Sequence, residues 1–424
     1  MAKKQRKPER PPNPPLAETG PVDVLVGIPT YNNARTIGHI IQSVNAGLSG
    51  RFPDKKVVIL VSDGGSFDGT PKIAAEAREN FGVIVQSHRV NPSDKISTPY
   101  HGIPGRGHAV QDMLEAAERL DVSACSILDG DLWNLSTDWI GELLDPVLNG
   151  GYDYIAPYYR RHRYDGGITG TIVYPMIRAL YGKRIRQPIG GQVGLSRNII
   201  REFLKDPVWN TDTAQYGLDI WMTVAAVIHG YRIGEVHLGG KRHDVRNLPA
   251  DLSTMLTQIL GSLFAIMKDS RGFWEEVKGS ESVPLLGKRS EAALVPVRVD
   301  VERMRKAFFL GLTEFLPVWK GVLSDGVLEA LRSLDSEPGS GIDLPDRLWA
   351  RLIYDFALAF HGKAMTPEHL LKSFTPLYLG KMASYIMETQ TLDDPAAEGK
   401  IDSLCSVFEE EKPYLAVRWD RTVE

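Results

Sequence analysis

Cysteine is scarce in this sequence, with only Cys125 and Cys405 in 424 residues. The two lie far apart and form no Cys-x-x-Cys pair, so we expect neither a disulfide framework nor a thiolate metal site, and a cytoplasmic location fits. Long apolar runs are missing as well. Stretches such as Ile220–Ile228 fall well short of the roughly 18 residues of a membrane span, so we expect buried helices and no span.

Charge of one sign is not in excess, because 49 Lys and Arg residues oppose 53 Asp and Glu residues, for a net charge of −4. This balance gives no support for nucleic-acid binding. The basic N-terminal residues lead into a proline cluster rather than an apolar segment, so we expect residues 1–21 to form a disordered tail and not a signal peptide. The remaining chain is long enough for a catalytic domain with an additional module.

Short apolar runs alternate with helical stretches from about residue 22. Strands are predicted at Val24–Ile28, Val57–Val61, Val83–Val85 and Ser126–Leu128, with helices between them such as residues 107–119. This alternation is typical of an α/β sheet with parallel strands, which binds ligands outside the carboxyl ends of its strands. The informative loops are therefore those that follow the strands.

The pattern becomes mixed after about residue 150, with strands predicted at Tyr154–Tyr158, Gln192–Leu195 and Arg232–Val236. Beyond residue 250 it turns helical, with Met255–Met267, residues 300–323 and residues 344–360 at helical spacing. We place a boundary near residue 290. The chain then divides into an α/β domain over 22–290 and a mainly helical C-terminal module over 291–424.

Asp129 and Asp131 follow the fourth predicted strand, separated by Gly130. Two carboxylates at this place can point into one cleft and suit Mg²⁺ or Mn²⁺ bridging a diphosphate. An ordinary Asp-Gly-Asp turn is the alternative interpretation. The position directly after a strand favours the metal site.

Two further loops follow the first and second strands. The first contains Pro29, Thr30, Tyr31 and Asn33, and the second contains Asp63 and Gly64. Small residues let the backbone approach a ligand, and a carboxylate can accept hydrogen bonds from a base or ribose. Taken alone, both loops are also ordinary turn chemistry, since Asn, Asp, Ser and Gly dominate turns.

In combination, "IPTYNNARTI", "SDGGSFDGT" and "LDGD" resemble the nucleotide-binding half of a GT-A glycosyltransferase, a Rossmann-like α/β fold. Further segments resemble the retaining glucosyl-3-phosphoglycerate synthases and glucosylglycerate synthases. They are "GRGHA" with Arg106, "QPIGGQ", "YGLDI" with Asp219, and "KRH" with His243. His108 and His237 are competing histidines on sequence grounds. Asp219 is alternatively a plain carboxylate near a helix N-terminus.

The resemblance implies roles for individual residues. Donor binding is implied for Pro29, Thr30, Tyr31, Asn33, Asp63, Gly64, Arg106, Asp129 and Gly130. Catalytic roles are implied for Asp131, Asp219 and His243, with Mg²⁺ or Mn²⁺ held by Asp129, Asp131 and His243. Acceptor binding is implied for Thr169, Gly190, Gly191, Gln192, Arg246 and Asn247.

The substrates implied are a nucleoside-diphosphate hexose, usually glucose, and glycerate or 3-phosphoglycerate as acceptor. The chain departs from the family at Gly166–Gly167–Ile168–Thr169, where relatives carry Gly-Arg-Val-Thr. The lost arginine favours glycerate, unless Arg160, Arg161, Lys183, Arg184 or Arg246 compensates.

Several alternatives stay open. Mannose can replace glucose. An inverting polysaccharide-type transferase would use Asp219 as a base, although the chain lacks a Gln-x-x-Arg-Trp motif. A sugar-nucleotide-binding protein without catalysis is a third class. The C-terminal helices either form a homodimer interface or cover the catalytic domain.

Overall fold

The fold is taken from a computed structural model of the chain. The structure describes residues 20–91, 94, 99–243, 252–288, 297–334, 342–362 and 365–423. Residues 1–19 of the predicted tail over 1–21, and the predicted boundary near residue 290, lie outside these described residues.

The strands are β1 (Val24–Thr30), β2 (Val57–Asp63), β3 (Gly82–Ser87), β4 (Ala124–Ile127), β5 (Tyr154–Tyr159), β6 (Lys183–Arg184), β7 (Val193–Ser196), β8 (Ile233–Gly239), β9 (Glu281–Ser282) and β10 (Leu285–Leu286). The helices up to residue 288 are α1 (Ile37–Arg51), α2 (Thr70–Glu76), α4 (Arg106–Arg119), α5 (Asp138–Leu148), α6 (Tyr174–Tyr181), α7 (Arg197–Phe203), α8 (Asp212–Tyr216), α9 (Leu218–Ile228), α10 (Leu252–Asp269) and α11 (Arg271–Trp274), with a π-helical turn η2 (Thr169–Val173) and a 3₁₀ turn η3 (Pro207–Asn210). The later helices are α12 (Val301–Glu314), α13 (Leu316–Trp319), α14 (Asp325–Arg332), α15 (Asp346–Gly362), α16 (Pro367–Ser373), α17 (Thr375–Thr389) and α18 (Asp394–Val423).

Eight strands form one mixed sheet in the order β10-β8-β5-β7-β4-β1-β2-β3. All neighbours pair in parallel except β7, which runs antiparallel to both β4 and β5. The predicted parallel strands β1 to β4 are confirmed, and their carboxyl ends lie at one edge. The antiparallel direction of β7 sends the segment before it, residues 187–192, past this same edge.

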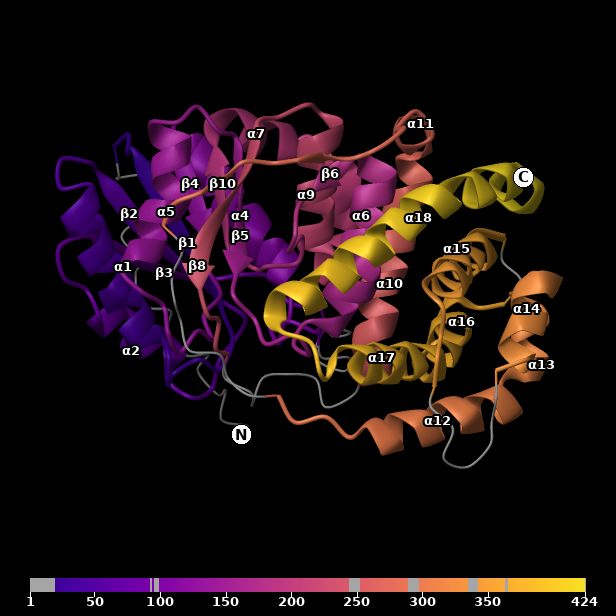
Figure 1. Cartoon of the computed structure of the whole chain (residues 1–424). Helices are drawn as coiled ribbons and strands as arrows, with labels where there is room; N and C mark the ends of the chain where they lie inside the picture. The colour runs from indigo at the N-terminus through magenta and orange to yellow at the C-terminus, as the bar shows by residue number, and fades with distance from the viewer. Residues whose placement is uncertain are drawn as a thin grey trace, which may run out of the picture.

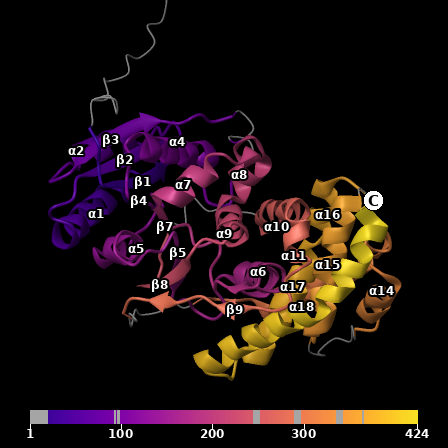
Figure 2. The same ribbon diagram turned by 90° about the horizontal axis from the view of Figure 1, so that it is seen from above.

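Helices cover both faces of the sheet (Figure 2). Successive side chains of each strand point to opposite faces, so each buried strand contributes to two cores. Val24, Val26 and Ile28 of β1 join one core with the apolar residues of α1 and α5. Leu25 joins the second core, which contains α4, α6 and α9. Gly27 of β1 is required by close packing, since a Cβ there would lie 2.5 Å from Met113 Sδ of α4.

The second core continues without interruption into the C-terminal helices, from Val22 to Trp419. Figure 1 shows these helices on one side of the sheet, with the long helix α18 crossing back toward it. Helix α18 packs on α6, η2 and α15. The predicted helix over 300–323 is two helices, α12 and α13, because Pro317 interrupts the backbone hydrogen bonds after Phe315.

No helix in the described part of the chain combines the length and the apolar content that a membrane crossing needs.

Candidate functional site

Asp129, Asp131 and His243 gather at the carboxyl end of β4. Each offers one ligand atom, and these atoms all lie within 4.8 Å of one another. The loop after β8 brings His243 into place, because Leu132 and His243 form an antiparallel bridge. Beside it, Trp133 N donates to Arg242 O at 2.9 Å and Arg242 N donates to Asn134 Oδ1 at 2.8 Å. Residues 112 positions apart in the chain are thereby held together.

This donor set fits a hard divalent cation, since carboxylate oxygens suit Mg²⁺ and Mn²⁺ and an imidazole favours Mn²⁺ among the two. His243 Nδ1 lies 3.0 Å from Asp131 Oδ1 and 3.1 Å from Asp131 Oδ2. Among the described residues, His243 is the only partner found for the Asp131 carboxylate. His108 and His237 are not members of the cluster.

Asp129 has a different environment, because protein groups already surround its carboxylate. Oδ2 accepts hydrogen bonds from Gln192 Nε2 at 2.6 Å and from Lys241 Nζ at 3.1 Å. Arg106 Nη2 lies 3.7 Å from Oδ1. Burial by itself would raise the pKa of Asp129, but Lys241 and Arg106 outweigh it and hold that pKa below its ordinary value. Asp129 is therefore held in its ionised form. Because fewer protein groups bind the Asp131 carboxylate, Asp131 is more accessible as a metal ligand.

Arg106 lies buried beneath this cluster, with 1% of its side chain exposed. Its Nη1 donates to Asp219 Oδ1 at 2.9 Å, and its Nη2 donates to Gly191 O at 3.3 Å. Helix α4 begins at Arg106, directly after its N-cap residue Gly105. Gly105 adopts φ 70°, a left-handed conformation that favours glycine. The structure thus joins Arg106, Asp129 and Asp219 in one buried ionic cluster.

Lys241 connects the cluster to the loop before β7. Its Nζ donates to Gly190 O at 2.6 Å and lies 5.1 Å from the centroid of the Tyr159 ring. Burial lowers the pKa of Lys241. The Tyr159 hydroxyl donates to Gln192 Oε1, which orients the Gln192 amide toward Asp129.

Gly191 and Gly130 are glycines because other groups occupy the space of a side chain. Gly191 adopts φ 86°, and a Cβ there would overlap Asp129 Oδ2 and lie 3.0 Å from Asp129 Cγ. A Cβ on Gly130 would lie 2.9 Å from both Pro29 O and Thr30 Cγ2. The predicted donor loop and the Asp129–Asp131 turn therefore pack directly against each other.

The predicted donor-binding loops after β1 and β2 form one hydrogen-bonded unit. Asp63 accepts from Thr30 Oγ1 at 3.1 Å, from Ser66 Oγ at 2.5 Å and from the backbone N–H groups of Gly65 and Ser66. Gly64 N donates to Thr30 O at 2.9 Å. Both carboxylate oxygens of Asp63 thus accept hydrogen bonds from within these two loops.

The first loop is closed internally as well. Tyr31 N donates to Asn33 Oδ1 at 2.8 Å, and Asn33 N donates to Thr70 Oγ1 at 2.8 Å. Thr36 Oγ1 donates to Gly130 O at 2.6 Å, which ties this loop to the Asp129–Asp131 turn.

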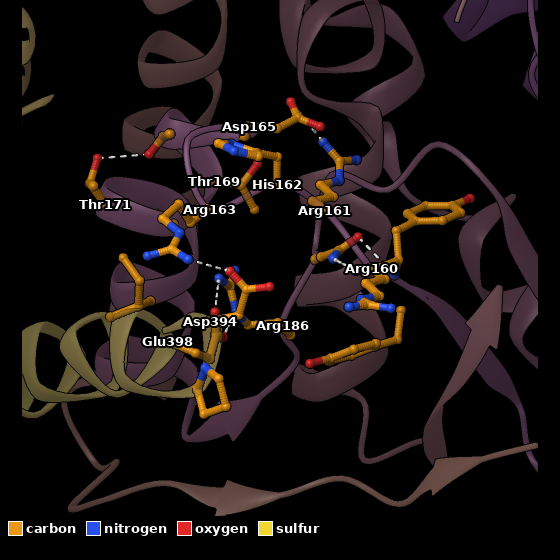
Figure 3. A pocket seen from close by; sticks show the side chains of 18 of the residues that line it. Arg160, Arg161, His162, Arg163, Asp165, Thr169, Thr171, Arg186, Asp394 and Glu398 are labelled. Carbon is orange, nitrogen blue, oxygen red and sulfur yellow. Dashed lines mark hydrogen bonds and ion pairs between the residues drawn. The ribbon is translucent and has the colours of Figure 1, made fainter. Parts of the chain in front are cut away.

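Tyr159, whose ring lies 5.1 Å from Lys241 Nζ, also lines a cavity of 860 Å³. Figure 3 shows the charged side chains of this cavity. Thr169 lines it, as do all three arginines of the Arg160–Arg161–His162–Arg163 run. Gly190, Gly191 and Gln192 lie at Asp129 instead. Arg246 and Asn247 fall outside the described residues. Lys183 and Arg184 are not in the cavity lining, because they bind Glu281 and Ser280 beside the small β6–β9 sheet.

Sequence reasoning missed three contributors to this region. Lys241 was noticed only as a neighbour of His243, and no pattern predicted Tyr159 or Glu235. Glu235 Oε1 accepts from Arg186 N at 2.8 Å and so ties Arg186, which lines the cavity, to β8. Burial raises the pKa of Glu235 to about 8.

Two family models match the sequence. The model described as glycosyl transferase family 2 matches residues 25–98, and the model described as mannosylglycerate synthase, GT domain, matches residues 77–267. The mixed sheet and the carboxylate turn after β4 agree with these matches, which support a glycosyltransferase of the GT-A fold. Over residues 77–267 the sequence is similar to the mannosylglycerate synthase GT domain.

Curated relatives include two glycosyltransferases of Haloferax volcanii. AglJ is 27% identical over 219 residues, which are 50% of this chain and 61% of AglJ. AglD is 26% identical over 266 residues, which are 58% of this chain and 38% of AglD. The chain thus spans less than two thirds of the length of either relative.

Similar solved structures include glucosyl-3-phosphoglycerate synthase from Mycobacterium tuberculosis and mannosyl-3-phosphoglycerate synthase from Rubrobacter xylanophilus. The first is 20% identical with a TM-score of 0.41 and covers 58% of this chain and 79% of its own. The second is 21% identical with a TM-score of 0.40 and covers 60% of this chain and 77% of its own.

Proposed function

We propose that the protein is a retaining, metal-dependent hexosyltransferase that moves glucose from a nucleoside-diphosphate glucose to D-glycerate, forming glucosylglycerate. The observation that carries this proposal is the Asp129–Asp131–His243 cluster beside an arginine-lined cavity. The match to the mannosylglycerate synthase GT domain supports a glycerate-type acceptor. The same match favours a second candidate, mannosyl transfer to glycerate.

Asp131 and His243 would hold Mg²⁺ or Mn²⁺ directly, with Asp129 oriented beside them. A bound divalent ion would supply electrostatic stabilisation of the departing nucleoside diphosphate. Lys241 and Arg106 keep Asp129 ionised, so Asp129 stays a carboxylate beside Asp131 and His243. The donor diphosphate would approach over the loops of β1 and β2, which the Thr36–Gly130 hydrogen bond holds against the cluster.

Asp219 is unsuited to act as a general base, since Arg106 binds its carboxylate at 2.9 Å and most of its surface is buried. A retaining front-face reaction needs no protein base, because the leaving phosphate oxygen can take the proton of the acceptor hydroxyl. We therefore assign Asp219 the role of fixing Arg106 under Asp129 and Gly191. The inverting alternative, which requires Asp219 as a base, lacks such support.

A product assay tests the proposal. The protein is incubated with Mn²⁺ or Mg²⁺, with ADP-, GDP- or UDP-linked glucose or mannose, and with D-glycerate or 3-phosphoglycerate, and products are identified by NMR. We expect an α-linked hexosylglycerate. Asp131→Ala and His243→Ala should each abolish its formation, whereas His229→Ala, at an exposed histidine, should not. A β-linked product, or transfer that survives both alanine substitutions, would refute the proposal.

A further inference from the structure

The cavity beside the metal cluster is built from segments that are far apart in the chain. Residues 158–171, Arg186 and β8 form one side, and the end of α17 with the first turn of α18 forms the other. Figure 3 shows Arg163 and Arg186 pointing toward Asp394 and Glu398 of α18. Tyr159 separates the cavity from the cluster, with Lys241 Nζ and Arg161 Cζ lying 5.1 Å and 5.6 Å from its ring centroid. A ligand in the cavity therefore lies across the Tyr159 ring from the cluster.

Arginines and carboxylates are equal in number in the cavity lining. Its four arginines are Arg160, Arg161, Arg163 and Arg186, and its four carboxylates are Asp165, Asp393, Asp394 and Glu398. Three of the carboxylates come from the start of α18 or the residue before it. Without this segment the lining would be strongly positive, and with it the lining is close to neutral.

Two of the arginines are engaged by the C-terminal helices. Arg163 Nη2 donates to Asp394 Oδ1 at 2.7 Å, and its Nη1 donates to the carbonyls of Thr389 and Leu392. Arg186 forms a two-pronged pair with Glu398, in which Nη2 donates to Oε2 at 3.0 Å and Nε donates to Oε1. A guanidinium paired in this way has little capacity left for an anionic ligand.

Helix α17 also fills the space beside Gly167, which lines the cavity. A Cβ on Gly167 would lie 2.6 Å from Tyr378 Oη and 2.7 Å from Met382 Sδ, both on α17. A side chain at this position would therefore require Tyr378 and Met382 to shift.

Arg161 differs from Arg163 and Arg186 because its pairing is weak. Among the described residues its closest carboxylate, Asp165 Oδ1, is 3.9 Å from Nη1, and its buried Nε has no hydrogen-bond partner. Thr169 lines the same cavity as Arg161. One guanidinium and one hydroxyl match one carboxylate with a neighbouring hydroxyl.

We propose that Asp394 and Glu398 of α18 are specificity-determining residues that make this site select a monoanionic hydroxy acid over its phosphate ester. This inference rests on the proposed function. A cavity of 860 Å³ holds either acceptor, so size does not discriminate between them. Charge does, because a phosphate monoester adds roughly −1.5 to −2 charges at pH 7. The carboxylates of α18 repel that charge and hold the arginines that would otherwise bind it.

Binding to the full-length protein in the presence of UDP and Mn²⁺ tests this directly. Titration calorimetry with D-glycerate and with 3-phosphoglycerate is compared for the wild type, Glu398→Gln, and the double variant Asp394→Asn/Glu398→Gln. We expect the wild type to prefer glycerate. In the double variant, the affinity for 3-phosphoglycerate should rise by about tenfold or more while that for glycerate changes by less than about threefold.

Glu409→Gln is the matched control, because Glu409 lies further along α18, outside the cavity lining, and pairs with Arg178 at 2.7 Å. It removes one negative charge from the same helix and should leave the ratio of the two affinities unchanged. Glu398→Gln retains the side-chain shape and gives a folded variant should the double variant unfold. It should shift the ratio in the same direction by a smaller factor.

The inference is overturned if the wild type binds 3-phosphoglycerate more tightly than glycerate, binds neither, or keeps its affinity ratio in both α18 variants. Hexose transfer, measured in parallel, separates the two proposals. Selective glycerate binding without any transfer would refute the proposed function and leave the role of α18 standing.

Discussion

Gly191 is the position where one added methyl group should do most damage to the metal cluster. Its backbone adopts φ 86°, and an alanine Cβ would overlap Asp129 Oδ2 and lie 3.0 Å from Cγ and 3.1 Å from Oδ1. Ordinary van der Waals contacts begin near 3.4 Å, so the whole carboxylate must shift by at least several tenths of an ångström. The hydrogen bonds from Gln192 and Lys241 end on the displaced oxygen.

The substitution Gly191→Ala should have two separate effects, one on folding stability and one on metal affinity. The left-handed backbone costs an alanine roughly 1–2 kcal/mol of folding stability, which a thermal or urea melt detects. Displacing a group that orients a metal ligand typically lowers metal affinity by about 10–100-fold. Mn²⁺ affinity, measured by electron paramagnetic resonance, should therefore fall far more than the loss of stability alone explains.

Gly230→Ala provides the matched control for this experiment. Gly230 adopts φ 69° in the turn before β8, and a Cβ there meets no atom within 4 Å. The control should lose a similar amount of stability and keep its Mn²⁺ affinity. Equal Mn²⁺ affinities in Gly191→Ala and Gly230→Ala would show that the packing at Asp129 does not shape the metal site.

Three further predictions concern residues around the site. Glu235 has a pKa raised to about 8 by burial, so its contribution to stability is lost as pH rises from 4.5 through 8. Glu235→Gln should therefore flatten the pH dependence of the free energy of unfolding by up to about 5 kcal/mol across that window, and an unchanged slope in urea melts would contradict this. Arg106→Met leaves Asp219 without its buried cation and Asp129 with Lys241 alone, and we expect a loss of about 3–5 kcal/mol in denaturant unfolding. Gly167→Arg should destabilise by about 1–3 kcal/mol through overpacking against Tyr378 and Met382 without improving 3-phosphoglycerate binding, and calorimetry showing tighter binding would refute the packing argument.

Local patterns were enough to predict the strands that carry the site. The short apolar runs of β1 and β2, which are buried along their whole length, and the polar residues at their ends are properties of short segments, and the sequence displays them directly. The sequence motifs also named Asp129, Asp131 and His243, which the structure brings within 4.8 Å. Their roles as ligands stay a prediction.

Such local patterns could not predict contacts between segments that are distant in the sequence. The Arg186–Glu398 pair joins residues 212 positions apart, and neither residue carries a local signal of the other. Nothing in the sequence says that α18 folds back toward the Arg160–Arg163 run. The packing of Gly167 against α17 likewise required the three-dimensional structure.

The central claim is that the Asp129–Asp131–His243 cluster makes hexose transfer dependent on a divalent cation. The most direct test measures the transfer of glucose to D-glycerate by the wild-type protein before chelation, after treatment with EDTA, and after Mn²⁺ is restored. The account predicts that transfer stops on chelation and returns with Mn²⁺, and that Mn²⁺ does not restore it in Asp131→Ala. Undiminished transfer in the presence of EDTA would contradict the account.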